Sequence, residues 1–422
     1  MGDVLFLSHR IPYPPNKGEK IRAWNVLKHL AQNNRVHLAT FIDAPEDLQE
    51  VSFLESICST VFWRKLDPKR AMMRSLTSLY TGAPLTKGYF GDRRFRAGVL
   101  RTMKRYQPSL IYVFSSAMLP YVVKDSGCRV VVDLVDVDSE KWRQYAAASS
   151  GLSRWMYARE GRTLLELERE GARSAHSVLL VSRPEAELFK KLAPELADRI
   201  HAFVNGVDTE YFNNTLSYPD PFGSRPAIVF TGLMDYRPNV DAMIWFVHNV
   251  MPGLRLHPSS PALWIVGANP ARPVRALAGD DVYVTGGVPD VRPYLRHARA
   301  VVAPLQIARG IQNKVLEAMA MGASVVATPQ ALEGLDKCEA DELLTAQNPS
   351  DFARKVMAIL DGKFTKMGAR ARARMAKDYR WEQSLALLDQ VLVSAMEQGR
   401  IGPGKADRRI GSEPTEDRII FS

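Results

Sequence analysis

Residues 301–328 read VVAPLQIARGIQNKVLEAMAMGASVVAT, and the fold class is clearest in this segment. The apolar run at 300–304 predicts a buried strand, and residues 310–321 have the apolar spacing of a helix. Gly322 is the expected end of that helix, and residues 324–328 predict a second strand. Two apolar strands joined by one helix are typical of a parallel pair with the helix packed on the sheet.

The same alternation extends in both directions from this unit. In the first half, buried strands are predicted at 3–9, 36–41, 60–66, 110–116, 129–136 and 177–182. A segment rich in Pro, Ser, Gly and Asp at 216–226 indicates an interdomain linker. Strands are then predicted again at 227–232, 262–267 and 282–285. We therefore expect an α/β protein with two doubly wound Rossmann-like domains, at 1–212 and 213–378, and a loose polar tail at 399–422.

The composition excludes a disordered chain, a collagen and a repeat of charged helices. The 422 residues are 46% hydrophobic and 24% charged, as in soluble globular proteins. The three cysteines (Cys58, Cys128 and Cys338) lie far apart, which argues against a disulfide framework or a structural zinc site. The N-terminal MGDVLFLSHR is typical of a first strand, and no apolar run is long enough to cross a bilayer. We expect a cytoplasmic protein, either free or peripheral on the cytoplasmic face of the inner membrane.

The net charge of +10 is local. Residues 64–105 contain twelve basic and two acidic residues, so this stretch carries the whole excess. Apolar Phe95, Val99 and Met103 alternate there with the basic residues Arg93, Arg94, Arg96, Arg101, Lys104 and Arg105. This pattern suits a membrane interface or an anionic acceptor, and equally an ordinary half-buried helix with a solvated face. No aromatic–basic motif for nucleic acid is present.

Residues 309–317 are candidates for binding a nucleotide-sugar. The start of the predicted helix attracts anions, and Gly310 allows close approach of the backbone. Arg309 and Lys314 are cations suited to a diphosphate, and Glu317 is suited to sugar hydroxyls. The alternative is a surface ion pair between Lys314 and Glu317, worth a few tenths of a kcal/mol.

Two other loops carry candidate residues. Gly18 stands at the entry to a helix predicted at 18–32, where it allows close approach to a phosphate or is only a turn residue. Asp136 and Asp138 lie at the end of the strand predicted at 129–136, with Ser139 as an expected helix N-cap. Asp136-Val-Asp138 has the form of a metal-binding DxD, but three residues are a weak motif and the chain shows two doubly wound domains. From the residues alone, helix capping is one interpretation of Asp138.

Several segments resemble, in order, those of the retaining family-four glycosyltransferases, which have the GT-B architecture of two Rossmann-like domains facing across a cleft. The segments are FVNGVDTEYF (203–212), FTGLMDYRPNVDA (230–242), LWIVGANP (263–270), VYVTGGVPDVRPYL (282–295), VLEAMAMGASVVATPQALEGL (315–335) and YRWE (379–382). VDLVDVDSEKWRQYA (132–146) and ARGIQNKVLEAMAMG (308–322) are more narrowly similar to sugar transferases of bacterial exopolysaccharide and PEP-CTERM/exosortase systems.

The resemblance implies roles for particular residues. Gly18 and Gly232 correspond to donor-site glycines and Glu317 to the signature carboxylate. Asp136 or Asp138 corresponds to an acceptor-side His or Asp, which implies that one of them orients or deprotonates the acceptor hydroxyl. A closing helix at 379–398 is expected to return to the first domain. Arg309 stands where many members have a glutamate, and Leu233 and Asn239 stand where many have diphosphate-binding cations. Arg309 and Lys314 are the expected substitutes, and Arg237 is a weaker one.

The resemblance therefore implies retaining, metal-independent glycosyl transfer from a UDP- or GDP-sugar to a saccharide or lipid-linked acceptor, without a cofactor, in bacterial exopolysaccharide or surface-polysaccharide assembly. Two alternatives remain: a nucleotide-sugar 2-epimerase of the same architecture, and a non-catalytic membrane-surface partner of a polysaccharide synthase.

Overall fold

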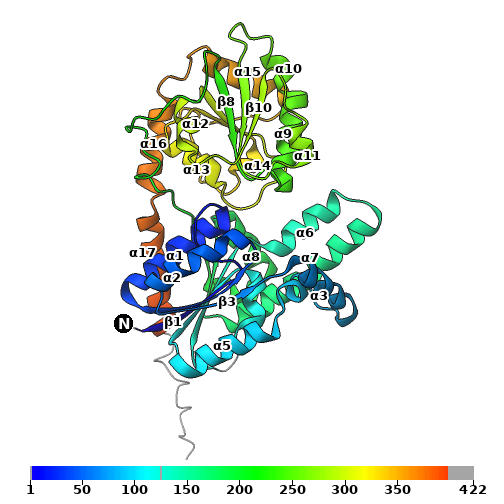
Figure 1. The fold of residues 1–422 in the computed structure, drawn as a ribbon, viewed down its shortest axis with the longest axis vertical. Coiled ribbons are helices and arrows are strands. Elements are labelled where there is room, and N and C mark those ends of the chain that lie inside the picture. Colours follow the sequence, from blue (N-terminus) through cyan, green and yellow to red (C-terminus); the bar gives the residue numbers. More distant parts are fainter. Residues whose placement is uncertain (1, 124–125, 398–422) are drawn as a thin grey trace, which may run out of the picture.

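Two parallel sheets organise the computed structural model, which describes residues 2–123 and 126–397 (Figure 1). Among these residues the first sheet has seven strands in the order β3-β2-β1-β4-β5-β6-β7, and the second has six in the order β10-β9-β8-β11-β12-β13. Neighbouring strands are parallel throughout. Both orders reverse beside the first strand, at β1/β4 and at β8/β11, as in doubly wound folds. The predicted fold class is confirmed. The predicted tail at 399–422 lies outside the described residues.

The elements alternate along the chain. The strands are β1 (Asp3–Ser8), β2 (Arg35–Ile42), β3 (Thr60–Lys65), β4 (Leu110–Phe114), β5 (Arg129–Val135), β6 (Ser177–Leu180), β7 (Ile200–Ala202), β8 (Ala227–Thr231), β9 (Ala262–Val266), β10 (Val282–Gly286), β11 (Ala300–Ala303), β12 (Val325–Ala327) and β13 (Leu344–Thr345). The first sheet's helices are α1 (Gly18–Asn33), α2 (Val51–Ile57), α3 (Pro68–Thr81), α4 (Leu85–Phe90), α5 (Arg93–Tyr106), α6 (Asp138–Ala147), α7 (Gly151–Ser174) and α8 (Arg183–Leu192), with 3-10 helices η1 (Pro45–Glu50), η2 (Ser116–Tyr121) and η3 (Pro194–Arg199).

The second sheet is covered by α9 (Arg237–Asn249), α10 (Met251–Leu254), α11 (Arg272–Arg275), α12 (Arg292–His297), α13 (Asn313–Ala320), α14 (Pro329–Leu332), α15 (Pro349–Leu360) and α16 (Met367–Asp378). The short strands β7 and β13 are not among those predicted from the sequence, because three and two residues are too few to show a pattern. The predicted helix at 310–321 begins later, at Asn313, because Gly310 has a φ of +61° and is not helical.

The last helix, α17 (Trp381–Glu397), packs on the first sheet. Its residues Leu385 and Leu388 share a buried cluster with Phe6 of β1 and Leu27 of α1. Figure 1 shows α17 running on from α16 to lie beside α1 and α2. The chain therefore crosses between the sheets twice.

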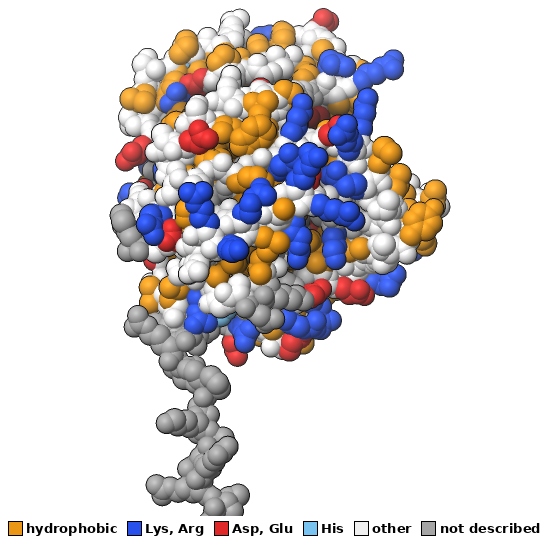
Figure 2. All heavy atoms as spheres, turned by 60° about the horizontal axis from the view of Figure 1, so that its bottom comes forward, with side chains coloured by type: hydrophobic (Ala, Val, Ile, Leu, Met, Phe, Trp, Pro, Cys, Tyr) orange, Lys and Arg blue, Asp and Glu red, His pale blue; other side chains and the backbone are white. Residues whose placement is uncertain are grey.

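Helix α5 presents its apolar side to the core. Phe95 is 0% exposed and Val99 is 1% exposed, in the cluster under the first sheet, and Met103 packs against them. The membrane-interface interpretation of these three apolar side chains is therefore wrong, because Phe95 and Val99 lie in the core and Met103 packs against it. The basic side chains of α5 form its outer face, and Lys and Arg gather on this end of the molecule (Figure 2).

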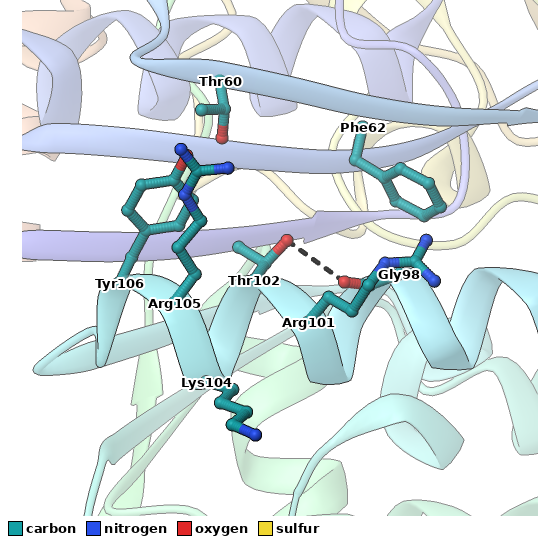
Figure 3. Close-up of a pocket in the computed structure, with 8 residues that line it drawn as sticks. All are labelled: Thr60, Phe62, Gly98, Arg101, Thr102, Lys104, Arg105 and Tyr106. Carbon is teal, nitrogen blue, oxygen red and sulfur yellow. Dashed lines mark hydrogen bonds between the residues drawn. The ribbon is translucent and has the colours of Figure 1, made fainter.

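The six predicted patch residues divide between two hollows beside α5. Arg101, Lys104 and Arg105 line one of about 570 Å³, together with Thr60 and Phe62 of β3 (Figure 3). Arg93, Arg94 and Arg96 line the other, of about 610 Å³, at the N-terminal end of the same helix. The second hollow lies where β3 ends and α5 begins, at the carboxyl edge of the sheet. We call it the arginine cavity.

Candidate functional site

Lys314 lies in the first turn of α13, beside the loop that follows β8. Its Nζ donates to Asn239 Oδ1 at 2.6 Å and lies 4.2 Å from the centre of the Phe230 ring. A Cβ on Gly232 would lie 3.0 Å from this Nζ and 2.8 Å from Asn239 Nδ2. The absence of a side chain at Gly232 therefore makes room for the lysine. These residues stand at the β8/β11 switch point, where doubly wound sheets bind ligands.

Burial shifts the pKa of both ionisable groups of α13. It lowers the pKa of Lys314 to about 7, against an opposing effect of Glu317. It raises the pKa of Glu317 to about 7, against an opposing effect of Lys314. Among the ion pairs of the described residues none joins these two side chains, so the alternative of a surface ion pair is wrong. Lys314 is instead a desolvated cation that would gain from an anionic partner.

The loop before α13 reaches across to the first sheet. A Cβ on Gly310 would lie 2.2 Å from Asp136 Oδ1 and 2.7 Å from Val181 Cγ1. On its other side, a Cβ on Gly334 would lie 2.3 Å from the Gly310 carbonyl oxygen. Gly310 is thus held between Asp136 and the Gly334 backbone, and any larger residue would separate them.

Asp136 is a buried acid whose pKa is strongly raised. Its Oδ1 is buried without a hydrogen-bond partner, and burial raises the pKa of the carboxyl to about 7, with further contributions from Glu185 and Asp138. Lys141 partly opposes this shift. A carboxyl that titrates near neutral pH is suited to general base catalysis.

Asp138 begins α6 but does not cap it. It accepts a hydrogen bond from Ser116 Oγ at 2.7 Å. The expectation that Ser139 caps this helix is also wrong, because Glu168 takes that role. The Glu168 carboxylate accepts from Ser139 N at 3.1 Å and from Ser139 Oγ at 2.5 Å. The capping alternative for Asp138 therefore has no hydrogen bond to support it.

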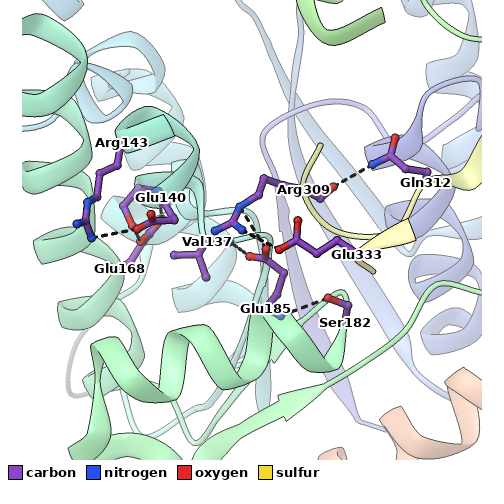
Figure 4. Close-up of polar contacts among 10 residues, drawn as sticks. Val137, Glu140, Arg143, Glu168, Ser182, Glu185, Arg309, Gln312 and Glu333 are labelled. Carbon is purple, nitrogen blue, oxygen red and sulfur yellow. Dashed lines mark hydrogen bonds and ion pairs between the residues drawn. The ribbon is translucent and has the colours of Figure 1, made fainter. Parts of the chain in front are cut away.

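Arg309 is engaged by two carboxylates in this conformation (Figure 4). Its Nε lies 3.4 Å from Glu185 Oε1 on the first sheet's α8, and its Nη1 lies 3.3 Å from Glu333 Oε1. Glu185 also accepts from Val137 N at 2.8 Å, next to Asp136. Arg309 therefore braces the Gly310 loop against the first sheet. Of the two predicted diphosphate cations, only Lys314 points to the Gly232 loop.

Gly18 is the first residue of α1, and the structure places it beside α13. A Cβ on Gly18 would lie 3.5 Å from Asn313 Nδ2. Asn205 Nδ2 donates to Asn313 Oδ1 at 3.1 Å, and Asn205 Oδ1 accepts from Arg22 of α1. Arg22 is 0% exposed and pairs with Asp133 at 2.8 Å. This buried network fixes α1, and with it Gly18, against the start of α13.

The structure thus brings together Gly18, Asp136, Asp138, Gly232, Arg309, Gly310, Lys314 and Glu317 around the ends of both sheets, and it leaves the six α5 residues outside this group. Sequence reasoning missed Asn205, Glu185, Asn313 and His9, and recognised Asn239 only as a departure. His9 follows β1, and its Nδ1 is buried without a partner. A histidine at the carboxyl end of the first strand was a usable signal, but Glu185, in the first turn of α8, looks like an ordinary acidic residue at a helix start and gave none.

Comparisons with known proteins bear on the fold and on the second half of the chain. Residues 225–362 match the family model of glycosyl transferases group 1. No curated protein matches the chain. Among solved structures, Anabaena HepE in complex with UDP has a TM-score of 0.66 at 15% identity, covering 93% of this chain and 100% of that one. Sucrose-phosphate synthase from Thermosynechococcus elongatus has a TM-score of 0.69 at 14% identity, covering 94% and 100%.

WaaG, a glycosyltransferase involved in lipopolysaccharide biosynthesis, has a TM-score of 0.64 at 16% identity, covering 92% of this chain and 99% of that one. At these identities the neighbours show the fold alone, which is the GT-B fold. The family match covers the part of the chain that contains Gly232, Lys314 and Glu317. Within residues 2–123 and 126–397, no helix has both the length and the apolar character needed to cross a membrane. The same residues contain no group of three or more His, Cys, Asp or Glu placed to hold a metal ion.

Proposed function

We propose that the protein transfers a sugar, with retention, from a nucleotide-sugar to a saccharide or lipid-linked acceptor. The observation that carries this proposal is the position of the Gly310 loop, which contacts Asp136 and leads directly to Lys314. Gly310 contacts Asp136 on one sheet, and three residues later the same loop enters α13 with Lys314 in its first turn. A cation for the donor and a carboxylate for the acceptor are thus joined by one short loop.

The chemistry follows from where charge develops. As the glycosidic bond of the donor breaks, the departing diphosphate gains negative charge. The Lys314 ammonium and the N-terminal N–H groups of α13 stabilise that charge. The departing phosphate oxygen helps to deprotonate the acceptor hydroxyl on the same face of the sugar, so no nucleophile of the enzyme is needed. Asp136 orients that hydroxyl or takes its proton, and Glu317 binds sugar hydroxyls. The proposed reaction uses neither metal nor cofactor.

The donor is proposed to be a UDP- or GDP-sugar, and UDP-sugars are the first to test. HepE was solved with UDP, with UDP-glucose, and with UDP and glucose. A role in bacterial exopolysaccharide or surface-polysaccharide assembly rests on the resemblance to sugar transferases of PEP-CTERM/exosortase systems. We place the reaction in the cytoplasm or on the cytoplasmic face of the inner membrane.

The test is an incubation with UDP- and GDP-sugars, with and without a lipid-linked saccharide acceptor, followed by analysis of the products. We expect sugar transfer only when acceptor is present, with the anomeric configuration of the donor kept in the product. A nucleotide-sugar changed at C2 without acceptor would identify a 2-epimerase instead. Neither product, together with no nucleotide-sugar binding in calorimetry, would leave the role of a synthase partner. Transfer with inversion would overturn the retaining mechanism.

A further inference from the structure

Helix α3 turns an apolar face to solvent. Its buried residues are Ala71, Ser75 and Ser78, all small. Its large apolar side chains are exposed instead: Met72 is 56% exposed, Met73 70%, Leu76 50% and Tyr80 94%. A surface helix of a soluble protein normally buries its large apolar residues, so this face marks an interaction site. We call these four side chains the α3 face.

The arginine cavity borders this face. Arg70 and Arg74 of α3 line the cavity. Met73 follows Arg70 by three residues, so these two side chains are neighbours on the surface of the helix. The cavity is lined by seven cations: Arg64, Arg70, Arg74, Lys87, Arg93, Arg94 and Arg96. The one acid in its lining, Asp92, accepts a hydrogen bond from Phe95 N. The Nε atoms of Arg64 and Arg74 are buried there without a hydrogen-bond partner.

We propose that the α3 face and the arginine cavity form a docking surface for a membrane that contains anionic phospholipid. The four apolar side chains enter the interface between headgroups and acyl chains, and the cavity receives lipid phosphates. Charge complementarity selects this occupant, since the seven clustered cations repel a basic surface and gain from an anionic one. Apolar side chains beside a polybasic patch supply the two contributions that stable interfacial binding needs.

The position of the cavity links docking to the proposed transfer. The cavity includes Gly91 and Asp92, which follow Phe90. The Phe90 ring lies 5.7 Å from the ring of His9, on the side of the first sheet where Asp138 lies. A membrane bound at the cavity would therefore lie beside the proposed acceptor side of the site. This inference adds to the proposed function, and it is tested without donor so that either can fail alone.

Sedimentation with vesicles tests the docking surface. We expect the wild-type protein to sediment with vesicles of equimolar phosphatidylcholine and phosphatidylglycerol, and not with phosphatidylcholine alone. Arg93→Gln with Arg94→Gln should weaken binding about thirtyfold, at roughly fivefold per charge. Met72→Ser with Met73→Ser should weaken it about tenfold, because two partly exposed apolar side chains no longer enter the interface.

Matched variants lie in the second domain. Leu256→Ser changes a side chain that is 85% exposed, and Arg272→Gln with Arg275→Gln removes two exposed charges from α11. These should bind vesicles like the wild type, and all variants should keep the wild-type melting temperature and affinity for nucleotide. Equal binding to both vesicle types would overturn the proposal. So would wild-type binding by either the arginine or the methionine variant. Loss with the arginine variant alone would show that the cavity binds anionic lipid without the α3 face, and would overturn the role given to that face.

Discussion

Lys314 is the residue with the most direct consequence for donor binding. Its ammonium is desolvated in the free protein, and its pKa is lowered to about 7. A bound diphosphate would stabilise the charged form, so binding should take up a proton. Lys314→Ala should therefore weaken nucleoside diphosphate binding by about 1.5–3 kcal/mol, the scale of a charge-assisted hydrogen bond.

The pH dependence of this binding has a definite sign. Lys314 is charged below its pKa, so wild-type affinity should be highest below about pH 7 and should fall as pH rises through that value. Calorimetry across this range, in buffers that differ in ionisation enthalpy, measures both the affinity and the proton uptake. Lys337→Ala, at an exposed lysine of the same domain, is the control. An affinity that Lys314→Ala leaves unchanged would remove this residue from the site.

Asp136 should show the opposite pH dependence. Its pKa is raised from 3.8 to about 7, so its carboxylate forms as pH rises through about 7. If it accepts the proton of the acceptor, turnover rises over this range, and Asp136→Asn lowers kcat about 10²–10⁴-fold. A raised folded-state pKa also means that the carboxyl costs stability above its unfolded pKa. Asp136→Asn should therefore raise the free energy of unfolding at pH 8, by up to about 4 kcal/mol at about 1.4 kcal/mol per pKa unit. Wild-type turnover in this variant would contradict the assignment.

At the scale of elements, the Gly310 loop has a matched control within the chain. Gly310→Ala would put a Cβ 2.2 Å from Asp136 Oδ1 at a φ of +61°. Gly362 has a φ of +75° with open space around it. Both substitutions should cost about 1–2 kcal/mol of stability for the left-handed backbone. Only Gly310→Ala should also lower turnover, because it separates the loop from Asp136. Thermal melts and kinetics on both variants check this, and equal turnover would show that the close approach is not needed.

Helix α17 offers a second matched pair. Leu388 is 0% exposed in the cluster that α17 shares with β1 and α1, and Leu387 is 40% exposed. Leu388→Ala should destabilise the protein by about 2–5 kcal/mol, from lost burial and the remaining cavity. Leu387→Ala should cost much less. Urea unfolding compares the two, and similar losses would mean that α17 is not part of this core.

Strands and helices were predictable from the sequence where a local hydrophobic pattern marks them. Continuous apolar runs gave most strands, because a strand buried on both faces leaves that mark in the sequence. The start of α13 was misplaced because Gly310 was assigned to the helix, whereas its positive φ suits a contact with Asp136 that lies far away in sequence. The period of α5 showed an amphipathic helix but not which neighbour its apolar side meets. Asn205, Asn239 and Glu185 were missed as site residues for the same reason: their partners are set by tertiary structure.

At the scale of the whole molecule, the two sheets are joined by paired crossings. Val207 N donates to Tyr379 O at 2.7 Å, and a Cβ on Gly206 would lie 2.5 Å from Trp381 N. The first crossing, at Gly206 and Val207, follows directly after Asn205. The second, at Tyr379, leads into α17. The segments that connect the domains are thus continuous with the contacts that hold Gly18 near α13, so domain orientation and site geometry are set by the same residues.

The hydrogen bond between Asn205 and Asn313 tests this coupling. It spans the two sheets at 3.1 Å, next to Gly18 and one residue before Lys314. If domain orientation matters only for transfer, Asn313→Ala should lower kcat while calorimetric affinity for the nucleoside diphosphate stays at wild type. A double-mutant cycle with Asn205→Ala should show a coupling of about 0.5–1.5 kcal/mol in kcat/KM, the net worth of one hydrogen bond. Asn249→Ala, which removes a hydrogen bond to Trp245 O within α9, is the control. Additive effects of Asn205→Ala and Asn313→Ala would mean that the two domains reach the transition state without this contact.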